Sequence, residues 1–419
     1  MNPLLQIKEY GQSVWLDYLS RDILESGELR QRIREDGVCG LTSNPAIFQK
    51  AISGSDIYDN PIRRMVLAGD DVDTIYQSIV VSDIQDAADE FKSVYLASGG
   101  QDGYVSLEVS PHLAHDTEGT IDEARKLWAA VNRPNLFIKV PGTEAGIPAI
   151  RQLISDGINV NVTLLFGLPR YKAAAQAYVD GLIDRLQAGH AVDNVYSVAS
   201  FFLSRIDVLV DKKLEKIIEN GGPKAAVSKE LRGQTAIANA KQAYQMYKQI
   251  FSTDTFHKLT SRGANGQRLL WASTSTKDPD YSDVKYVEAL IGPDTVNTMP
   301  SETLDAYRDH GQPAARLEED MALSYKTLTR LPDVGIDLDT VTDQLEREGV
   351  KKFIDPFDKL MQAIADQRQT FLAESTDSEA HSATNSDLPA REETIDPNSK
   401  VDEELLESFP ASDASGNWK

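Results

Sequence analysis

The feature that most constrains this chain is a regular alternation of short apolar runs with longer helical stretches. Eight runs rich in aliphatic and aromatic residues are typical of buried strands, and they fall at residues 14–17, 37–42, 104–109, 135–140, 158–165, 195–200, 269–273 and 294–299. Helical periodicity fills stretches between them, such as 121–131, 145–155 and 171–186. This alternation predicts a parallel sheet with helical crossovers, and eight units predict an α/β fold of the closed (β/α)8 TIM type. The two longest gaps, 50–100 and 206–268, are predicted to be helical insertions.

An open, doubly wound sheet is the competing architecture. Such a sheet normally carries a Gly-rich phosphate loop directly after its first strand. Here the first strand leads into DYLSR at residues 17–21, and neither GxGxxG nor GxxxxGK[ST] follows. The sequence therefore favours the closed barrel.

Composition changes sharply near Phe371. From about residue 373 to residue 419, Ser, Asp, Glu, Thr and Pro dominate. Such a segment has too little apolar surface to offset the entropy lost on ordering. We therefore predict a folded barrel at residues 1–372 and a disordered acidic tail at 373–419.

The net charge of −22 argues against whole classes of partner. A chain this acidic is not expected to hold nucleic acid or an anionic membrane by bulk electrostatics, although a local basic pocket could still bind a phosphate. Cys39 is the only cysteine, so an intrachain disulfide cannot form. No stretch approaches the ~18 apolar residues of a membrane span, and the first residues do not resemble a signal peptide. These features predict a soluble cytoplasmic protein. The sequence leaves a homodimer open and indicates no partner for the tail.

Polar residues stand where buried barrel strands should be apolar. Several of the predicted strands end in one or are directly followed by one, namely Asp17, Asn44, Glu108, Lys139, Asn161 with Thr163, and Ser200. Because the C-terminal ends of barrel strands face the active site, we expect these side chains to meet at one mouth. The pattern is typical of a catalytic site.

Lys139 is the most informative of these residues. It follows Leu-Phe-Ile and precedes Val-Pro-Gly-Thr, so its amine should be poorly solvated. Desolvation favours the neutral amine, which is a nucleophile that can condense with a ketone. A lysine that extends out of the strand end to solvent, or that pairs with a carboxylate, is the alternative.

Asp17 and Glu108 are the candidate acid and base for Schiff-base chemistry, which needs several proton transfers. One carboxylate could serve the sugar hydroxyl, while the other, with Thr163, could hold a water. The alternative is that one of them merely pairs with Lys139. No HxxxH or DxD cluster stands beside them, so a metal site is not expected.

Arg205 and Lys277 are the candidate phosphate ligands. Each places a cation and nearby hydroxyls just past a predicted strand end. Loops after the late strands of a barrel commonly bind phosphate. Ordinary surface charge is the alternative for both residues.

Several stretches of the chain together resemble transaldolase in its longer bacterial and plant-type form. The resemblance runs from about residue 10 to residue 370 and rests on SVWLDYLSRD, GLTSNPAIFQKAI, YVSLEVSP, NLFIKVPGTEAGIPAIRQLISDGINVNVTLLF, YSVASFFLSRID, WASTSTKDP and VNTMP. The run KVPGT followed by NVTLLF is the most specific part. The family's second phosphate-binding arginine has no counterpart after the seventh strand, where the chain reads STSTK and Lys277 is the substitute.

The resemblance implies a role for each candidate residue. Lys139 would form the Schiff base, and Asp17 would be the acid/base at C–C cleavage. Glu108 and Thr163 would position and activate the catalytic water. The remaining implied contacts are sugar hydroxyls for Asn44 and Asn161, and phosphate for Ser200, Arg205 and Lys277.

The implied reaction moves a three-carbon dihydroxyacetone unit. Sedoheptulose 7-phosphate plus glyceraldehyde 3-phosphate would give erythrose 4-phosphate plus fructose 6-phosphate, in the non-oxidative pentose phosphate pathway. No cofactor or metal is implied. Two rival hypotheses remain: a related lysine aldolase that shares the barrel and the lysine, and a non-catalytic barrel that acts as a scaffold through its tail.

Overall fold

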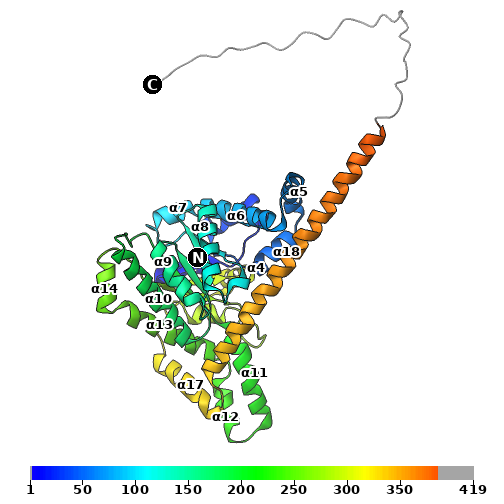
Figure 1. Ribbon diagram of the computed structural model, residues 1–419. Helices are drawn as coiled ribbons and strands as arrows, with labels where there is room; N and C mark the ends of the chain where they lie inside the picture. The colour runs from blue at the N-terminus through cyan, green and yellow to red at the C-terminus, as the bar shows by residue number, and fades with distance from the viewer. Residues whose placement is uncertain (1, 386–419) are drawn as a thin grey trace, which may run out of the picture. The chain divides into compact units, whose positions relative to one another are not determined.

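The computed structural model describes residues 2–385, with side chains as far as residue 375. By its internal contacts the chain divides into two units, Met1–Leu372 and Ala373–Lys419. The first unit holds all the strands that the structure describes, and Figure 1 labels the helices around them.

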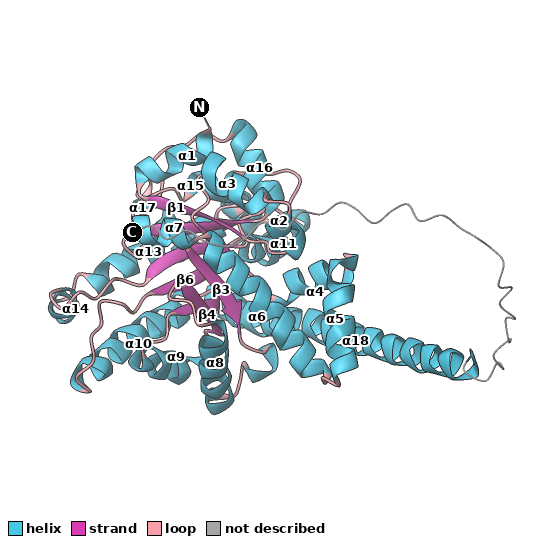
Figure 2. Cartoon of the chain, turned by 90° about the horizontal axis from the view of Figure 1, so that it is seen from above, coloured by secondary structure: helices cyan, strands magenta, loops and turns pink. Residues whose placement is uncertain are grey.

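Eight parallel strands close into a barrel in sequence order, with the last strand paired to the first. Figure 2 shows them at the centre of a surrounding layer of helices. The strands are β1 (Gln12–Leu16), β2 (Gly40–Thr42), β3 (Tyr104–Glu108), β4 (Leu136–Pro141), β5 (Val160–Leu165), β6 (Ser197–Phe202), β7 (Arg268–Ala272) and β8 (Thr295–Met299). The predicted fold is therefore confirmed, and each strand overlaps the run predicted for it.

Helices follow the strands as crossovers, and the two predicted insertions are helical. The crossovers after β3, β4 and β5 are α8 (Thr117–Val131), α9 (Gly146–Asp156) and α10 (Leu168–Gln187). The first insertion comprises α4 (Pro45–Ser53), η2 (Asp56–Tyr58), α5 (Asp59–Ala68), α6 (Val72–Glu90) and α7 (Lys92–Ala97). The second comprises α11 (Ser204–Asn220), α12 (Pro223–Leu231), α13 (Thr235–Phe251) and α14 (Asp254–Thr260). The remaining helices are α1 (Pro3–Ile7), η1 (Lys8–Tyr10), α2 (Arg21–Glu25), α3 (Glu28–Glu35), η3 (Pro111–Leu113), α15 (Lys285–Ala289), α16 (Ser301–His310), α17 (Met321–Val334) and α18 (Leu338–Asn385).

Aromatic side chains fill the lower part of the barrel interior. Trp15, Tyr104 and Phe137 are buried, and their ring centroids lie 4.3 to 6.5 Å apart. Side chains two residues apart on a strand share a face, so Trp15 and Phe137 lie one layer below Asp17 and Lys139. This aromatic floor is completed beneath by Arg268, whose Nη2 lies 3.1 Å from Asp102 Oδ1.

The aromatic floor leaves no room for a side chain at Gly40. A Cβ added there would overlap the buried Trp15 indole, which is held on both sides by packed rings. We expect Gly40→Ala to lower the free energy of unfolding by about 1–3 kcal/mol, as overpacking of a close-packed core does. Urea unfolding would measure this. Gly266→Ala is the matched control, because its Cβ would meet Tyr247 Oη at 3.2 Å and the rings of Tyr247 and Phe251 at ordinary van der Waals distances of 3.6 and 3.7 Å; equal losses in both variants would contradict the expectation.

Before Leu372, helix α18 runs past α4 and α5 (Figures 1 and 2). Near its start, Glu346 pairs with Arg170 of α10 at 2.9 Å. Farther along, Arg368 donates to the backbone oxygen of Asp70, just past α5. Between these two contacts, Phe353 reaches the pocket described below. The C-terminal helix therefore contributes a residue to the site, and this contribution was not predicted from the sequence.

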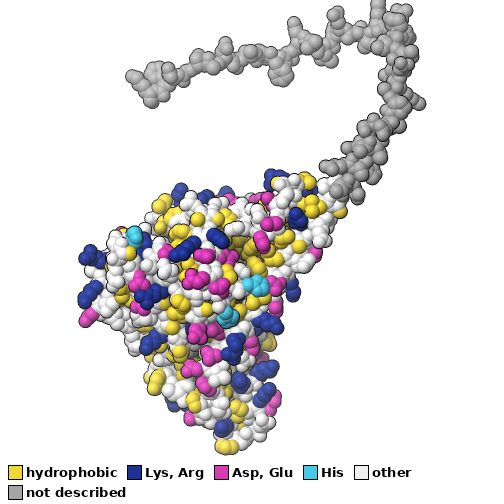
Figure 3. Space-filling view, in the orientation of Figure 1, with side chains coloured by type: hydrophobic (Ala, Val, Ile, Leu, Met, Phe, Trp, Pro, Cys, Tyr) yellow, Lys and Arg dark blue, Asp and Glu magenta, His cyan; other side chains and the backbone are white. Residues whose placement is uncertain are grey.

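The structure does not test the predicted disorder of the tail. Helix α18 continues to Asn385, so the described residues of 373–385 are helical, and residues 386–419 lie outside the described residues. The disorder of the tail and its boundary at residue 373 stay predictions. Among the described helices, none is long and apolar enough to cross a membrane. On the face shown in Figure 3, basic and acidic side chains are interspersed rather than gathered into one basic stripe.

Candidate active site

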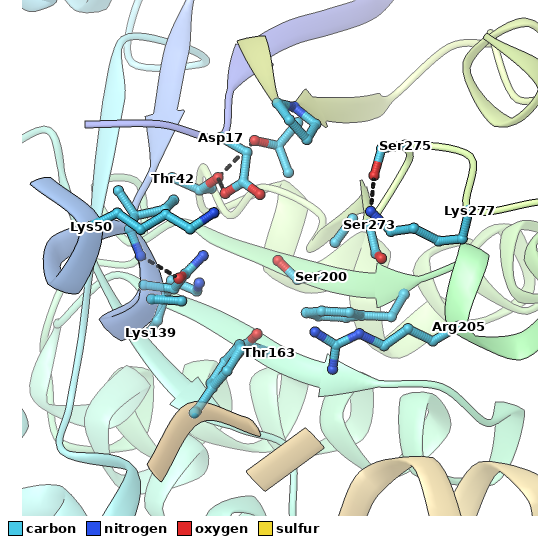
Figure 4. Close-up of a pocket in the computed structure, with 18 residues that line it drawn as sticks. Asp17, Thr42, Lys50, Lys139, Thr163, Ser200, Arg205, Ser273, Ser275 and Lys277 are labelled. Atoms are coloured by element: carbon cyan, nitrogen blue, oxygen red, sulfur yellow. Dashed lines mark hydrogen bonds between the residues drawn. The ribbon is translucent and has the colours of Figure 1, made fainter. Parts of the chain in front are cut away.

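A pocket of about 310 Å³ opens at the C-terminal ends of the strands (Figure 4). Seven of the nine predicted site residues line it, namely Asp17, Asn44, Lys139, Thr163, Ser200, Arg205 and Lys277. The other two, Glu108 and Asn161, are buried beside it and contact lining residues. The structure therefore brings together all nine residues from seven different strand ends or loops.

Lys139 lies on β4 and is 5% exposed, so the alternative in which it extends to solvent is wrong. Its Nζ lies 3.3 Å from Glu108 Oε2 and donates to the backbone oxygen of Ser43 at 2.9 Å. The strand register explains the first contact, because Glu108 on β3 stands directly beside Lys139. On the open side, the ring of Phe353 lies 5.9 Å from Nζ. A buried amine is thus held in the pocket between a carboxylate and an aromatic face.

Glu108 is a carboxylate with unusual proton affinity. Burial raises its pKa to about 7, although Lys139 opposes the rise. The 3.3 Å contact with Lys139 lacks hydrogen-bond geometry, and neither carboxylate oxygen has a hydrogen-bond partner among the described residues. A carboxyl group that exchanges its proton near neutral pH is suited to acid and base catalysis.

The raised pKa of Glu108 predicts a pH-dependent stability. Its folded-state pKa of about 7 exceeds the ordinary 4.5, so its stabilising contribution is complete below about pH 4.5 and is lost as the pH rises through about 7. Glu108→Gln removes this titration. Between about pH 5 and about pH 8, we expect the wild type to lose roughly 2–3 kcal/mol more stability than the variant does. Urea unfolding at both pH values checks this, and parallel pH dependence in the two proteins would refute it.

Asp17 follows β1 and is held by a hydroxyl chain. Thr42 Oγ1 donates to Asp17 Oδ1 at 2.7 Å and lies 2.7 Å from Thr298 Oγ1. Burial raises the pKa of the Asp17 carboxyl, and the charge of Lys139 is the largest opposing influence. Asp17 therefore also has a raised proton affinity, in the same pocket as the amine.

Thr163 is placed by an irregularity in β5. The register between β5 and β6 shifts between Val162 and Leu165, and Leu164 has a φ of +60°. A non-glycine residue in this left-handed region is strained by about 1–3 kcal/mol, and such strain clusters at functional sites. Thr163 Oγ1 is buried and finds no hydrogen-bond partner in the part of the chain that the structure describes. The bulge thus presents an unsatisfied hydroxyl to the pocket.

Three amide and hydroxyl groups form the polar wall of the site. Ser200 Oγ donates to Asn161 Oδ1 at 2.7 Å, and Asn161 Nδ2 donates to Ser106 Oγ at 3.1 Å. Asn44 caps α4, its Oδ1 accepting from the backbone of Ile47 at 3.1 Å. The cap leaves the Nδ2 of Asn44 to donate to a ligand. This wall offers donors and acceptors that match sugar hydroxyls.

The two predicted phosphate cations lie together on one side of the pocket, away from Lys139 (Figure 4). Arg205 stands in the first turn of α11, and burial lowers the pKa of its guanidinium. Its Nη1 is buried and has no hydrogen-bond partner within the described residues. Lys277 is exposed, and its Nζ donates to Ser275 Oγ at 2.6 Å. Arg205 is therefore a half-buried cation with one buried, unsatisfied nitrogen, and Lys277 is a surface cation on a loop.

Sequence reasoning missed several lining residues. Lys50 and Thr42 stand in the same stretch of sequence as Asn44, and this proximity could have identified them as lining residues. Phe353 gave no signal, because only the packing of α18 brings it to the mouth. Among the described residues, no group of three or more His, Cys, Asp and Glu side chains is arranged to hold a metal. The pocket instead combines cations, amides and hydroxyls, as a sugar phosphate requires.

Comparisons with known proteins agree on one family. The family described as Transaldolase/Fructose-6-phosphate aldolase matches residues 14–364. A protein of Nostoc punctiforme named Transaldolase 2 is 52% identical over 371 residues, covering 87% of this chain and 97% of the relative. A protein of a second Nostoc species, also named Transaldolase 2, is 51% identical over 369 residues with the same coverage. A Thiobacillus denitrificans protein named Transaldolase is 47% identical over 364 residues, covering 87% of this chain and all of the relative.

Proposed function

The chain belongs to the transaldolase family of transferases, and from this premise we propose that it transfers a three-carbon dihydroxyacetone unit through a Schiff base on Lys139. The observation that carries the proposal is the buried amine of Lys139 in a pocket with two carboxyl groups of raised pKa. The family acts on sugar phosphates, and the reaction proposed is sedoheptulose 7-phosphate with glyceraldehyde 3-phosphate giving erythrose 4-phosphate and fructose 6-phosphate. Relatives that are named transaldolase along nearly their full length support this over a simple aldolase.

Lys139 opens the reaction as the nucleophile. It adds to the C2 carbonyl of the ketose, and loss of water gives an iminium. When the C4 hydroxyl loses its proton, the C3–C4 bond breaks and its electron pair moves to the iminium nitrogen. The shortened aldose phosphate leaves, and the three-carbon enamine stays on Lys139 until its C3 attacks the aldehyde of an acceptor. The aromatic ring of Phe353 shields this side of the pocket from water.

Asp17 takes the proton of the C4 hydroxyl in cleavage and returns it to the new alkoxide in transfer. Its raised pKa suits both directions, because such a carboxyl group binds the proton more readily than an ordinary carboxylate and can then return it. The hydroxyl of Thr42 fixes the orientation of the carboxylate. Asp17 is therefore the acid/base of the C–C bond.

Glu108 and Thr163 serve the water that enters and leaves at the iminium. Both have buried oxygen atoms without hydrogen-bond partners among the described residues, and a water molecule can satisfy such atoms. Glu108 stands beside Lys139 and can pass a proton to that water, with its pKa of about 7. Thr163 orients the water from β5.

Arg205, Ser200 and Lys277 hold the phosphate, and Asn44 and Asn161 hold the sugar hydroxyls. The unsatisfied Nη1 of Arg205 gives a charge-assisted hydrogen bond to a phosphate oxygen. Lys277 contributes a point charge rather than a bidentate fork. We also propose a cytoplasmic location and a functional barrel that ends near residue 372.

Borohydride trapping tests the proposal. The protein is incubated with fructose 6-phosphate, reduced, digested and mapped by mass spectrometry. We expect a three-carbon adduct on Lys139, and erythrose 4-phosphate added before reduction should discharge it. An adduct that water discharges but erythrose 4-phosphate does not would instead indicate an aldolase. Folded protein with no adduct on any lysine would contradict both and favour a scaffold.

A further inference from the structure

The loop that carries Lys277 is fastened to the second helical insertion. It leaves β7 after Ala272 and ends where α15 begins at Lys285. Lys277 itself is exposed, and a flexible lysine on a free loop would lose much entropy on binding a phosphate. Contacts that fix the loop beforehand would therefore decide how well Lys277 works as a ligand.

Arg232 makes the contact nearest to Lys277. At the C-terminal end of α12, its Nη2 donates to Asp278 Oδ2 at 2.9 Å, and its Nε donates to Glu215 Oε1 at 2.9 Å. Asp278 is the residue directly after Lys277, so the ion pair holds the loop at the cation itself. Arg232 thereby bridges α11, which carries Glu215, and the loop after β7.

Tyr281 strengthens the same attachment. The guanidinium of Arg232 lies 5.1 Å from its ring centroid, and its hydroxyl donates to Asp211 Oδ2 at 2.9 Å. The other oxygen of Asp211 accepts from the backbone of Gly233 at 2.9 Å. The loop, α11 and the end of α12 thus share one network.

The same network reaches the other phosphate cation. Asp207, two residues after Arg205 on α11, accepts from Lys285 Nζ at 3.1 Å and from Tyr286 Oη at 2.9 Å. These two partners stand at the start of α15, where the Lys277 loop ends. The helix that carries Arg205 and the loop that carries Lys277 are therefore tied to each other at Asp278, within the loop, and at the start of α15, where the loop ends.

We propose that Arg232 is a positioning residue for phosphate binding: through Asp278 it holds the Lys277 loop against α11, so that Lys277 and Arg205 contact the same phosphate group. This proposal rests on the proposed transfer between sugar phosphates. Arg232 does not line the pocket, so it acts only through the loop. Its loss should weaken the binding of anything that carries a phosphate and leave the chemistry at Lys139 unchanged.

Steady-state kinetics on the full chain test this. In Arg232→Met we expect the KM for fructose 6-phosphate and the inhibition constant of inorganic phosphate to rise together, roughly tenfold, as for one weakened charge-assisted hydrogen bond. The kcat should stay within about twofold of the wild type. Asp278→Asn removes the 2.9 Å pair from the loop side and leaves only the 3.6 Å contact of Arg232 with Asp280, so both constants should rise in this variant too. Arg330→Met is the matched control, since Arg330 pairs with Glu230 of α12 without touching the loop, and it should change neither constant.

A double-variant cycle separates positioning from general stability. Because Arg232 acts through Lys277, adding Arg232→Met to Lys277→Met should raise the phosphate inhibition constant no further. Additive effects, an unchanged inhibition constant in Arg232→Met and Asp278→Asn, or a fall in kcat without a change in KM would each overturn the proposal. These results require a wild type that transfers; a wild type that forms no adduct on Lys139 refutes the proposed function itself.

Discussion

Lys139→Met should abolish transfer in a protein that stays folded. Methionine keeps the length of the side chain but has no amine, so neither the iminium nor the enamine can form. We expect kcat to fall by at least ~10⁴-fold, as when a covalent nucleophile is removed from an enzyme. Turnover of fructose 6-phosphate with an aldose acceptor gives the rate, and borohydride trapping should leave no adduct.

The neighbouring lysine of the pocket provides the control for this variant. Lys50 also lines the pocket, but it is exposed on α4 and does not pair with Glu108. Lys50→Met should still form the three-carbon adduct on Lys139. Circular dichroism and phosphate binding at Arg205 check that Lys139→Met is folded. An adduct found on Lys50, or substantial turnover by Lys139→Met, would contradict the assignment.

Asp17→Asn should separate imine formation from C–C cleavage. The amide can still accept from Thr42 but cannot take the proton of the C4 hydroxyl. We expect kcat to fall by ~10²–10⁴-fold, the usual share of a general acid or base. Because the iminium still forms, reduction should trap the intact six-carbon ketose phosphate on Lys139 instead of the three-carbon unit.

Asp22→Asn is the matched control, since Asp22 lies just beyond Asp17 on α2 and is exposed. It should give the three-carbon adduct at the normal rate. The mass of the trapped peptide decides the question directly. A three-carbon adduct in Asp17→Asn, formed as fast as in the wild type, would assign the cleavage proton to another group.

The residues that meet at the pocket could be predicted from the sequence because a polar group in a doubly buried strand needs a reason. Lys139 and Glu108 stand out in this way, and the parallel register then places them side by side. Desolvation of both follows from the strand position alone. The polar side chains of the pocket could therefore be predicted from the local sequence pattern and from the topology of a closed barrel.

Features that depend on long-range packing could not be predicted from the sequence. Helical periodicity in α18 indicates an apolar face but not the surface it covers, so Phe353 was missed at the pocket. No glycine marks the bulge at Leu164, whose positive φ is imposed by the ladder around it. The strand β6 was predicted to end at Ser200 but continues to Phe202, because its pairing with β7 extends to Ala272.

Pairings between distant loops were equally hidden. Arg232 and Asp278 lie 46 positions apart, and each reads as ordinary surface charge in the sequence. Only the fold shows that the first reaches the residue beside Lys277. Such contacts depend on how distant segments of the chain approach each other in the fold. Neither the charge pattern nor the periodicity of the sequence predicts this approach.

The aromatic floor of Trp15, Tyr104 and Phe137 closes the pocket at its lower end. A ligand that reaches Lys139 must therefore enter and leave at the open end of the pocket, where Phe353 lies. In the proposed transfer, the first aldose has to leave before the second can enter. In this interval the three-carbon fragment stays on Lys139 while the pocket is open to solvent. The fate of that fragment then depends on which molecule enters the pocket first, because an aldehyde accepts the three-carbon unit whereas water hydrolyses it from Lys139.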